Sequence, residues 1–413
     1  MNRQRVKLLE DRLVMESKNK VLILAPHYKS FIKELVEATS SYVGSINILI
    51  HHNYLTEIFT YFPAALYLHH VRRYTKANLL DLKGKPRNID VYLVSLLYFV
   101  TDGKNKSLGD KITKKAEKFI QERGLRFDLI HAHFTYPCGY TGVNLGEKFG
   151  VPVIITAHGY DVYDLPFRDK EWEEKIKWTL NKADHIITVS QSNKKILVEK
   201  LGVSENKLSI IPNGFNPKLF HSITNKTSVK QKLGLSIDKK IILNVADLYP
   251  VKGQRYLIEA MKEIIKYRKD ILCIIIGDGV LRKNLKTQVR KLGLENYVQL
   301  AGSKPHDEIP LWMNAADLFV LPSLSEGNPT VMFEALGCGK PFVGTKVGGV
   351  PEVIASEDYG LLCEPANAED LAEKILTALE KQWNTEKIRR YAEQFTWENI
   401  AKRVIEIYND LLA

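Results

Sequence analysis

The sequence predicts an α/β protein with two doubly wound, Rossmann-like domains. A chain of 413 residues exceeds what one hydrophobic core usually serves, so we expect two domains of about 200 residues each. Short runs of apolar, mostly β-branched residues recur in both halves without polar alternation, which is typical of parallel strands buried on both faces. Helical-looking stretches separate these runs. This alternation favours a parallel sheet covered by helices on both faces in each domain.

Two series of apolar runs define the expected strands. The first series comprises residues 20–25, 46–50, 91–97, 129–131, 153–156 and 186–189. The second comprises residues 240–245, 271–276, 298–301, 318–321, 341–344 and 360–363. Between them, residues 215–224 contain Pro217 and several polar residues and are the best candidate for a linker. We therefore place an N-terminal domain at residues 1–214, a linker at 215–224 and a C-terminal domain at 225–395.

The net charge of +11 is not shared evenly between the two halves. Lys and Arg outnumber Asp and Glu by 33 to 23 through Lys218, and by only 26 to 25 beyond it. The basic half can meet an anionic partner such as phospholipid head groups, a lipid-linked diphosphate or nucleic acid, and it can equally be a lysine-rich solvated surface. Nucleic acid is the least expected partner, because the chain has no aromatic stacking motif and no known nucleic-acid-binding module.

The cysteines and the N-terminus indicate a cytoplasmic protein, soluble or peripheral to a membrane. The four cysteines form no Cys-x-x-Cys pair, so they fit neither a zinc site nor a dense disulfide framework. The first 20 residues lack the apolar core of a signal peptide, and the longest apolar run, residues 91–100, is too short to cross a bilayer. Residues 61–80 have the composition of either an interfacial helix on the inner face of an anionic membrane or a helix packed on its own sheet, and we favour the second.

The segment PSLSEGNPTVMFEALGCGKP, residues 322–341, carries the most specific pattern in the chain. It joins the end of an expected strand to a helix that begins at Thr330, directly after Pro329. Free backbone N–H groups at such a helix start, together with the helix dipole, make a seat for a diphosphate. Glu326 and Glu334 lie eight positions apart on either side of this seat. Their carboxylates can accept hydrogen bonds from ligand hydroxyl groups, with Glu334 placed for the vicinal hydroxyls of a ribose.

This segment resembles the Glu-x7-Glu motif of glycosyltransferase family 4, the large group of retaining sugar transferases with the GT-B fold. Other similar segments follow the family's order along the chain, and they are ADHIITVS at 183–190, IIPNGFNPKLF at 210–220, VKGQRYLIEA at 251–260 and VGGVPEVI at 347–354. The similarity extends from about Asp128 to the C-terminus. It implies two domains that face a cleft, with a final helix at 397–412 that crosses back, so that residues 396–413 belong to the N-terminal, acceptor-side domain.

The resemblance implies that the C-terminal domain binds a nucleoside diphosphate sugar of the UDP or GDP type. Besides Glu334, the expected donor-binding residues are Gly327, Asn328, Pro329, Thr330 and Val331 at the helix start, Gly277 and Gly279 in a strand-end turn, and Ser303 and Lys304 after the next strand.

Lys252 is expected to place a positive charge near the diphosphate and to neutralise the leaving group, while Glu326 positions the sugar. The chain departs from the family at Asp247, where an arginine is usual. Because an aspartate there would repel a diphosphate, we expect Asp247 to point away and another cation, Lys29 or Arg255, to compensate.

On the N-terminal domain, His158 in TAHGYD follows an expected strand and matches the family's histidine beside the transferred sugar. Neutral imidazole can bond a hydroxyl group or the leaving phosphate oxygen, so His158 is a catalytic candidate together with Lys252 and Glu326. The loop after the first strand lacks the glycine pair that family members commonly carry there, so acceptor recognition is expected to be unusual. The expected acceptor-side residues are His27, Tyr28, Lys29 and Asp161.

Histidine pairs at residues 51–52, 69–70 and 131/133 raise the question of a metal site. Adjacent residues of a strand point to opposite sides, and no carboxylate or cysteine completes a ligand set. The chain contains no Asp-x-Asp, the pattern with which other transferases hold a metal on the diphosphate. We expect neither a metal nor another cofactor.

The resemblance, together with these residues, implies a retaining, metal-independent hexosyltransferase that moves a sugar from a nucleoside diphosphate to a hydroxyl of a glycan or lipid-linked acceptor, as in polysaccharide biosynthesis. The alternative is a non-catalytic partner subunit of a glycosylation or polysaccharide-assembly system, in which Asp247 has disabled the diphosphate clamp. Binding of nucleoside diphosphates distinguishes the two, because a partner subunit need not bind them.

Overall fold

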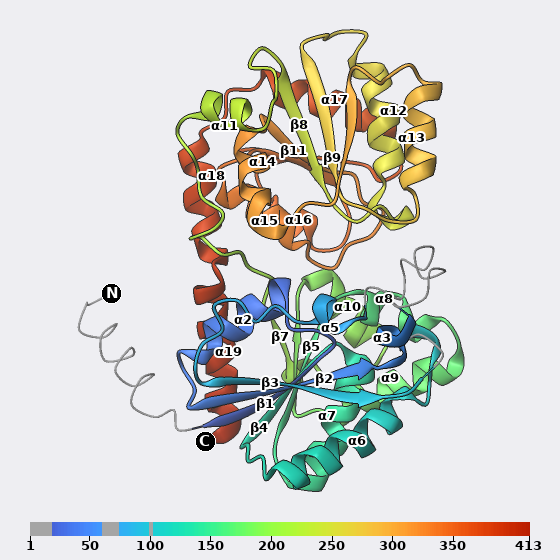
Figure 1. Ribbon diagram of the computed structural model, residues 1–413, viewed down its shortest axis with the longest axis vertical. Helices are drawn as coiled ribbons and strands as arrows, with labels where there is room; N and C mark the ends of the chain where they lie inside the picture. Colours follow the sequence, from blue (N-terminus) through green and yellow to red (C-terminus); the bar gives the residue numbers. More distant parts are fainter. Residues whose placement is uncertain (1–18, 60–73, 99–101) are drawn as a thin grey trace, which may run out of the picture. The chain divides into compact units, whose positions relative to one another are not determined.

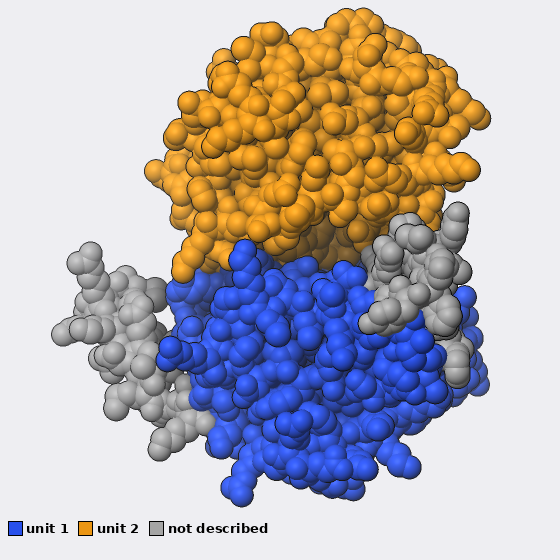
Figure 2. Space-filling model, in the orientation of Figure 1, with its two compact units in different colours: residues 1–212, 397–413 blue, residues 213–396 orange. Residues whose placement is uncertain are grey.

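The computed structural model describes residues 19–59, 74–98 and 102–413 and divides into two compact units (Figures 1 and 2). The first unit, blue in Figure 2, comprises residues 1–212 and 397–413, and the second, orange, comprises residues 213–396. Each unit contains one parallel sheet with helices on both faces, which confirms the prediction of two doubly wound α/β domains.

The sheet of the first unit has seven parallel strands in the order β3-β2-β1-β4-β5-β6-β7. They are β1 (Lys20–Ala25), β2 (Ser45–Asn53), β3 (Ile89–Leu96), β4 (Leu129–His133), β5 (Val153–Ala157), β6 (His185–Thr188) and β7 (Leu208–Ile210). In register, Val21 of β1 pairs with Ile46 on one side and with Leu129 on the other. The strand order reverses at β1 and β4, and the carboxyl ends of strands at such a reversal are where doubly wound sheets bind ligands.

Helices cover both faces of this sheet. They are α2 (Ser30–Ser40), α3 (Leu55–Phe59), α5 (Lys76–Leu79), α6 (Leu108–Arg123), α7 (Tyr140–Phe149), α8 (Tyr160–Tyr163), α9 (Lys170–Lys182), α10 (Gln191–Glu199) and α19 (Trp397–Leu412). Alternate residues of β1 belong to the two cores, with Leu22 packing toward α6 and α7 and Ile23 packing toward α2 and α19. The final helix α19 therefore crosses back into the first unit, as expected, and its Tyr408 Oη lies 2.6 Å from His131 Nδ1.

The second unit repeats the topology with six parallel strands in the order β10-β9-β8-β11-β12-β13. They are β8 (Lys240–Val245), β9 (Ile271–Ile276), β10 (Val298–Gly302), β11 (Leu318–Leu321), β12 (Phe342–Thr345) and β13 (Gly360–Cys363). The helices are α11 (Lys226–Lys232), α12 (Gln254–Ile264), α13 (Arg282–Lys291), α14 (Ile309–Ala315), α15 (Thr330–Gly337), α16 (Val350–Val353), α17 (Ala368–Glu380) and α18 (Thr385–Ala392). Helices α12, α13 and α17 bury one face of the sheet, and α14, α15 and α18 bury the other.

Residues 215–224, which we expect to be a linker, lie inside the second unit. The aromatic side chains of Phe215 and Phe220 are buried in its core, and Phe215 forms a β-bridge with Thr396. Burial of two large apolar side chains stabilises a segment against the sheet, so its polar composition alone did not indicate its packing.

The proposed interfacial helix at 61–80 lies largely outside the described residues, because only its last part, which includes α5, is described. Within the described ranges, no helix combines the length and apolar character needed to cross a membrane.

Candidate functional site

In the second unit, Lys252 and Glu326 form a close ion pair beside the carboxyl end of β11. Lys252 Nζ lies 2.7 Å from Glu326 Oε1, and the hydroxyl of Ser323 donates to the same oxygen at 2.6 Å. The Glu326 side chain is only 7% exposed, whereas that of Lys252 is 28% exposed. The buried carboxylate is therefore compensated by one cation and one hydroxyl, and the lysine remains reachable from solvent.

Glycines hold the loops of this pair in position. Gly253 has φ of 66° directly after Lys252, and a Cβ there would lie 1.9 Å from the Pro322 carbonyl oxygen. A Cβ on Gly348, with φ of 51°, would lie 1.7 Å from the carbonyl oxygen of Glu326. Both positions combine a left-handed backbone with a contact that excludes any side chain. The Lys252–Glu326 geometry is thus built by close backbone packing.

The loop after Glu326 leads directly into the start of α15 at Thr330. Asn328 is buried and clamps the loop, since its Oδ1 accepts from the Asn213 backbone N–H at 2.8 Å and its carbonyl accepts from Asn213 Nδ2 at 2.6 Å. Pro329 occupies the N-cap position and supplies no side-chain cap. The first N–H groups of a helix have no partner within the helix, so those after Pro329 are donors for an anion. The helix start lies between Glu326 and Glu334; Gly327 is buried, and Thr330 and Val331 are half-buried.

Glu334 has a partner that the sequence pattern did not reveal. His306 Nε2 lies 2.9 Å from Glu334 Oε1, and the His306 side chain is 40% exposed while that of Glu334 is 7% exposed. The pairing joins α15 to the turn after β10. A carboxylate has about four lone-pair sites, so Glu334 keeps acceptor capacity for a diol beyond the bond to His306.

Gly277 and Gly279 follow β9 and pack closely against the backbone of the loop after β8. A Cβ on Gly277 would lie 1.9 Å from the Ala246 carbonyl oxygen, and one on Gly279 would lie 2.6 Å from that of Leu248. Their φ values of 145° and 159° are also unfavourable for other residues. Packing of this turn against the loop after β8 therefore requires glycine at both positions, and their role in donor binding stays a prediction.

The remaining donor-side residues lie at the ends of β8 and β10. Ser303 is exposed, and Lys304 Nζ lies 5.4 Å from the ring centroid of Trp312. Asp247 is exposed in the loop after β8, where its backbone carbonyl accepts from Gln254 Nε2 at 3.0 Å. Arg255, expected as a compensating cation, lies over the ring of its neighbour Tyr256 at 4.3 Å. The cation–π contact with Tyr256 therefore holds the Arg255 guanidinium in place and does not involve Asp247.

In the first unit, His158 follows β5 and contacts a second histidine. His158 Nε2 lies 3.1 Å from Nδ1 of His133, the last residue of the neighbouring strand β4, and the two rings are stacked at 5.3 Å. Phe31 and Phe134 also contact the His158 ring, with centroids at 5.1 and 4.6 Å. Burial lowers the pKa of both histidines well below the ordinary value, so both are neutral at physiological pH.

Asp161 is fully buried, and its carboxylate accepts hydrogen bonds from the backbone around His158. Its Oδ1 accepts from the N–H groups of His158 and Gly159 at 3.0 and 2.8 Å, and its Oδ2 accepts from the Thr135 N–H at 2.8 Å. Burial raises the pKa of this carboxyl to about 6, while the three N–H donors act in the opposite direction. Asp161 thus fixes the loop rather than meeting an acceptor.

The other expected acceptor-side residues, Tyr28, Lys29 and His27, have different environments in the structure. Tyr28 is completely buried, with its hydroxyl donating to Glu37 Oε1 at 2.9 Å, so its side chain belongs to the core and not to an acceptor surface. Lys29 is half-buried at the N-cap of α2. His27 is close enough to His133 and His158 to affect their pKa values, and burial, with Lys29 as a second cause, lowers the pKa of His27 to about 4.

The sequence reasoning missed His133, His306 and Ser323 as members of the two sites. Each follows or ends a strand, and this position at the carboxyl edge of the sheet is the signal that could have found them. Of the histidine pairs, 69–70 lies outside the described residues. In the part of the chain that the structure describes, no cluster of three or more His, Cys, Asp or Glu side chains could hold a metal ion.

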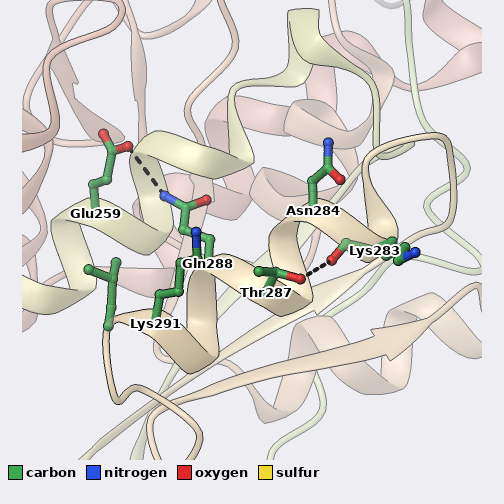
Figure 3. Close-up of a pocket in the computed structure, with 7 residues that line it drawn as sticks. Glu259, Lys283, Asn284, Thr287, Gln288 and Lys291 are labelled. Atoms are coloured by element: carbon green, nitrogen blue, oxygen red, sulfur yellow. Dashed lines mark hydrogen bonds between the residues drawn. The ribbon is translucent and has the colours of Figure 1, made fainter.

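A surface pocket of about 550 Å³ lies elsewhere, between α12 and α13 (Figure 3). It is lined by Glu259, Lys283, Asn284, Thr287, Gln288, Lys291 and Leu292. Glu259 and Gln288 bond across it at 3.3 Å. None of the residues expected to bind the donor lines this pocket.

Comparison with known proteins gives consistent relatives. Residues 225–395 match the family described as Glycosyl transferases group 1, and residues 85–219 match Glycosyltransferase Family 4. An uncharacterized glycosyltransferase of Methanocaldococcus jannaschii is 32% identical over 306 residues, which cover 72% of this chain and 79% of that protein. The N-acetyl-alpha-D-glucosaminyl L-malate synthase of Bacillus anthracis is 28% identical over 313 residues, covering 73% and 79%. The GPI3 subunit of the Saccharomyces cerevisiae phosphatidylinositol N-acetylglucosaminyltransferase is 26% identical over 293 residues, covering 69% and 64%.

Solved structures show the same fold. Sucrose-phosphate synthase of Thermosynechococcus elongatus superposes with a TM-score of 0.79 at 21% identity, covering 95% of this chain and 99% of that one. The Anabaena HepE protein in complex with UDP-glucose superposes with a TM-score of 0.71 at 22% identity, covering 95% and 100%. With both sheets, both family matches and the relative at 32% identity in agreement, the chain belongs to glycosyltransferase family 4 and has the GT-B fold.

Proposed function

We propose that this glycosyltransferase moves a hexose-type sugar, with retention, from a nucleoside diphosphate to a hydroxyl of a glycan or lipid-linked acceptor. The observation that carries the proposal is the start of α15, which lies along the chain between Glu326, the partner of Lys252, and Glu334. Backbone N–H groups and one reachable ammonium suit a diphosphate, and the carboxylate on each side suits hydroxyl groups. The Anabaena structural neighbour, solved with UDP-glucose, supports a donor of this class.

A bound diphosphate is negatively charged, so the site must supply positive charge or hydrogen-bond donors to hold it. Lys252 is already paired with buried Glu326, so the pair carries no net charge, and the helix start contributes roughly half an elementary positive charge. A bound diphosphate would share Lys252 with Glu326. No metal is needed in this proposal, because hydrogen bonds from the helix start and the shared lysine stabilise the leaving phosphate.

In the proposed reaction, the bond between the anomeric carbon and the diphosphate oxygen breaks and a bond to the acceptor oxygen forms on the same face of the sugar. The acceptor proton passes to the leaving phosphate, so no enzyme nucleophile is required. Glu326 accepts a hydrogen bond from the sugar and positions it. Neutral His158 bonds a sugar hydroxyl or a phosphate oxygen. The excess positive charge of the N-terminal half supports an acceptor that is anionic or lies at an anionic membrane.

The test is release of nucleoside diphosphate from a panel of UDP- and GDP-linked hexoses, with and without EDTA. We expect turnover of at least one donor that survives EDTA and is lost in Glu326→Gln. Lys346→Ala, which breaks the exposed Lys346–Glu364 pair in the same unit, is the matched control and should keep full turnover. Loss of activity that only a metal restores would overturn metal independence. The absence of binding to every donor of the panel would favour the non-catalytic partner subunit, because such a subunit need not bind a nucleoside diphosphate.

A further inference from the structure

His133 is the residue whose position the proposed reaction leaves unused. It ends β4, its side chain is completely buried, and its Nδ1 lies 3.1 Å from Nε2 of His158. The opposite nitrogens, His133 Nε2 and His158 Nδ1, are buried and have no hydrogen-bond partner among the described residues. Buried polar atoms are nearly always paired, so such atoms in one cluster require an explanation.

The bond between the two histidines couples their tautomers. Each ring carries a single N–H because both are neutral, and only one proton can lie between His133 Nδ1 and His158 Nε2. If His133 donates, His158 carries its proton on Nδ1. If His158 donates, its Nδ1 is a bare acceptor. In both states Nε2 of His158 is occupied, and Nδ1 is its nitrogen for any ligand oxygen.

Packing keeps the two rings in this arrangement. His131 stacks on the other side of His133 at 4.6 Å, and it is anchored by Tyr408 Oη at 2.6 Å and Thr156 Oγ1 at 2.7 Å. The ring of Phe134 packs against the ring of His158. The backbone φ of Phe134 is 71°. A bulky residue rarely adopts that conformation, and such strain persists where the surrounding structure enforces it.

We propose that His133 is a positioning residue that holds Nε2 of His158 and thereby makes Nδ1 of His158 the nitrogen that meets the donor or acceptor oxygen. The role of His158 toward substrate rests on the proposed function. The hydrogen bond between His133 and His158, and its effect on the His158 tautomer, do not depend on the proposed function. The positioning role of His133 and the proposed reaction can therefore be disproved separately.

The direct test is ¹⁵N NMR of the full chain labelled at histidine, in which ring shifts and couplings report the tautomer. The His158 signals are identified by their loss in His158→Gln. We expect wild-type His158 to show one dominant tautomer and His133→Phe, which keeps a stacked ring but no hydrogen bond, to show a changed population. His133→Asn places a side-chain amide near the position of His133 Nδ1. Because the amide can donate or accept a hydrogen bond, depending on its orientation, this variant should restore the wild-type His158 signal.

The matched control is His185→Gln, because His185 is a half-buried histidine of β6 that bonds Ser209 Oγ at 2.9 Å. It should leave the His158 signals unchanged. In turnover assays, His133→Phe should lower kcat about tenfold, the value of one hydrogen bond to an oriented group, while KM for the donor changes little and His133→Asn recovers most of the loss. Unchanged His158 signals in a folded His133→Phe would overturn the proposal, as would equal losses in His133→Phe and His133→Asn.

Discussion

The two units share one topology and place different chemistry at the carboxyl ends of their strands. The first unit gathers neutral, buried imidazoles among aromatic rings at β1, β4 and β5. The second gathers the Lys252–Glu326 ion pair and the hydrogen-bonded pair of His306 and Glu334 around a helix start. Neutral hydrogen-bonding groups suit hydroxyls, whereas backbone N–H groups with a lysine suit an anion. The fold therefore does not determine the chemistry, and the side chains at the strand ends do.

The largest expected effect comes from removing the lysine of the second unit. We expect Lys252→Met to weaken nucleoside diphosphate binding about a hundredfold, because opposite charges about 4 Å apart interact by about 4 kcal/mol at an effective dielectric of about 20 before desolvation. Isothermal titration measures it. Since the variant leaves the buried Glu326 carboxylate without its cation, Lys252→Met/Glu326→Gln serves as a control that should regain thermal stability without regaining affinity. Full affinity in Lys252→Met would mean that the anion binds elsewhere.

The second effect separates the two glutamates. Glu334→Ala should weaken nucleotide binding about tenfold or more, the cost of losing a hydrogen bond to a charged acceptor, which is about 1.5–3 kcal/mol. Glu326→Gln should mainly lower kcat, because Glu326 contacts the sugar in the proposed reaction. His306→Ala removes the partner of Glu334 and should change affinity less than Glu334→Ala does. Equal kinetic behaviour of the two glutamate variants would remove the distinction between a ribose end and a sugar end.

A smaller effect is expected at Asp247, which is exposed near the same strand ends. Replacing it with the arginine usual in the family, Asp247→Arg, should tighten nucleoside diphosphate binding by about tenfold through added positive charge. Asp238→Arg makes the same charge change at another exposed position of the second unit and should have little effect. If both variants bind alike, the loop after β8 does not face the diphosphate.

The smallest effect concerns the neutral chemistry of the first unit. The pKa of His27 is about 4 in the folded protein against 6.5 when unfolded, so the stability it contributes is present above pH 6.5 and is lost as the pH falls toward 4. Between pH 7.5 and 5.5 wild-type should lose about 1.4 kcal/mol of unfolding free energy that His27→Gln does not lose. Chemical denaturation at the two pH values measures the difference. Parallel pH dependence of both proteins would show that His27 titrates normally.

Sequence reasoning located the fold well because continuous apolar runs are strong local signals. The bounds of β1, β8, β9, β11, β13 and α19 agree with the expected runs to the residue. β7 was missed, since its three residues give too short a run, and Tyr28 was interpreted as a loop residue although it pairs with Leu80 and is buried. Such short or irregular pieces depend on neighbours that are distant in sequence.

The sites were only partly predictable for the same reason. Glu326, Glu334, Lys252 and His158 belong to recognisable local patterns, but the patterns do not show that Lys252 pairs with Glu326, nor that His133 and His306 are the partners of His158 and Glu334. His133 is 25 residues from His158, His306 is 28 from Glu334, and Lys252 is 74 from Glu326. The sheet order brings these pairs together, and a single sequence does not specify which strand-end side chains meet.

The most direct measurement is a crystal structure of the full chain with a bound nucleoside diphosphate sugar. We expect the diphosphate within hydrogen-bond distance of the N–H groups at the start of α15 and of Lys252 Nζ, with the ribose hydroxyls on Glu334. A diphosphate bound away from α15, for example in the pocket between α12 and α13 in Figure 3, would contradict the assignment of the charged site in the second unit as the donor site.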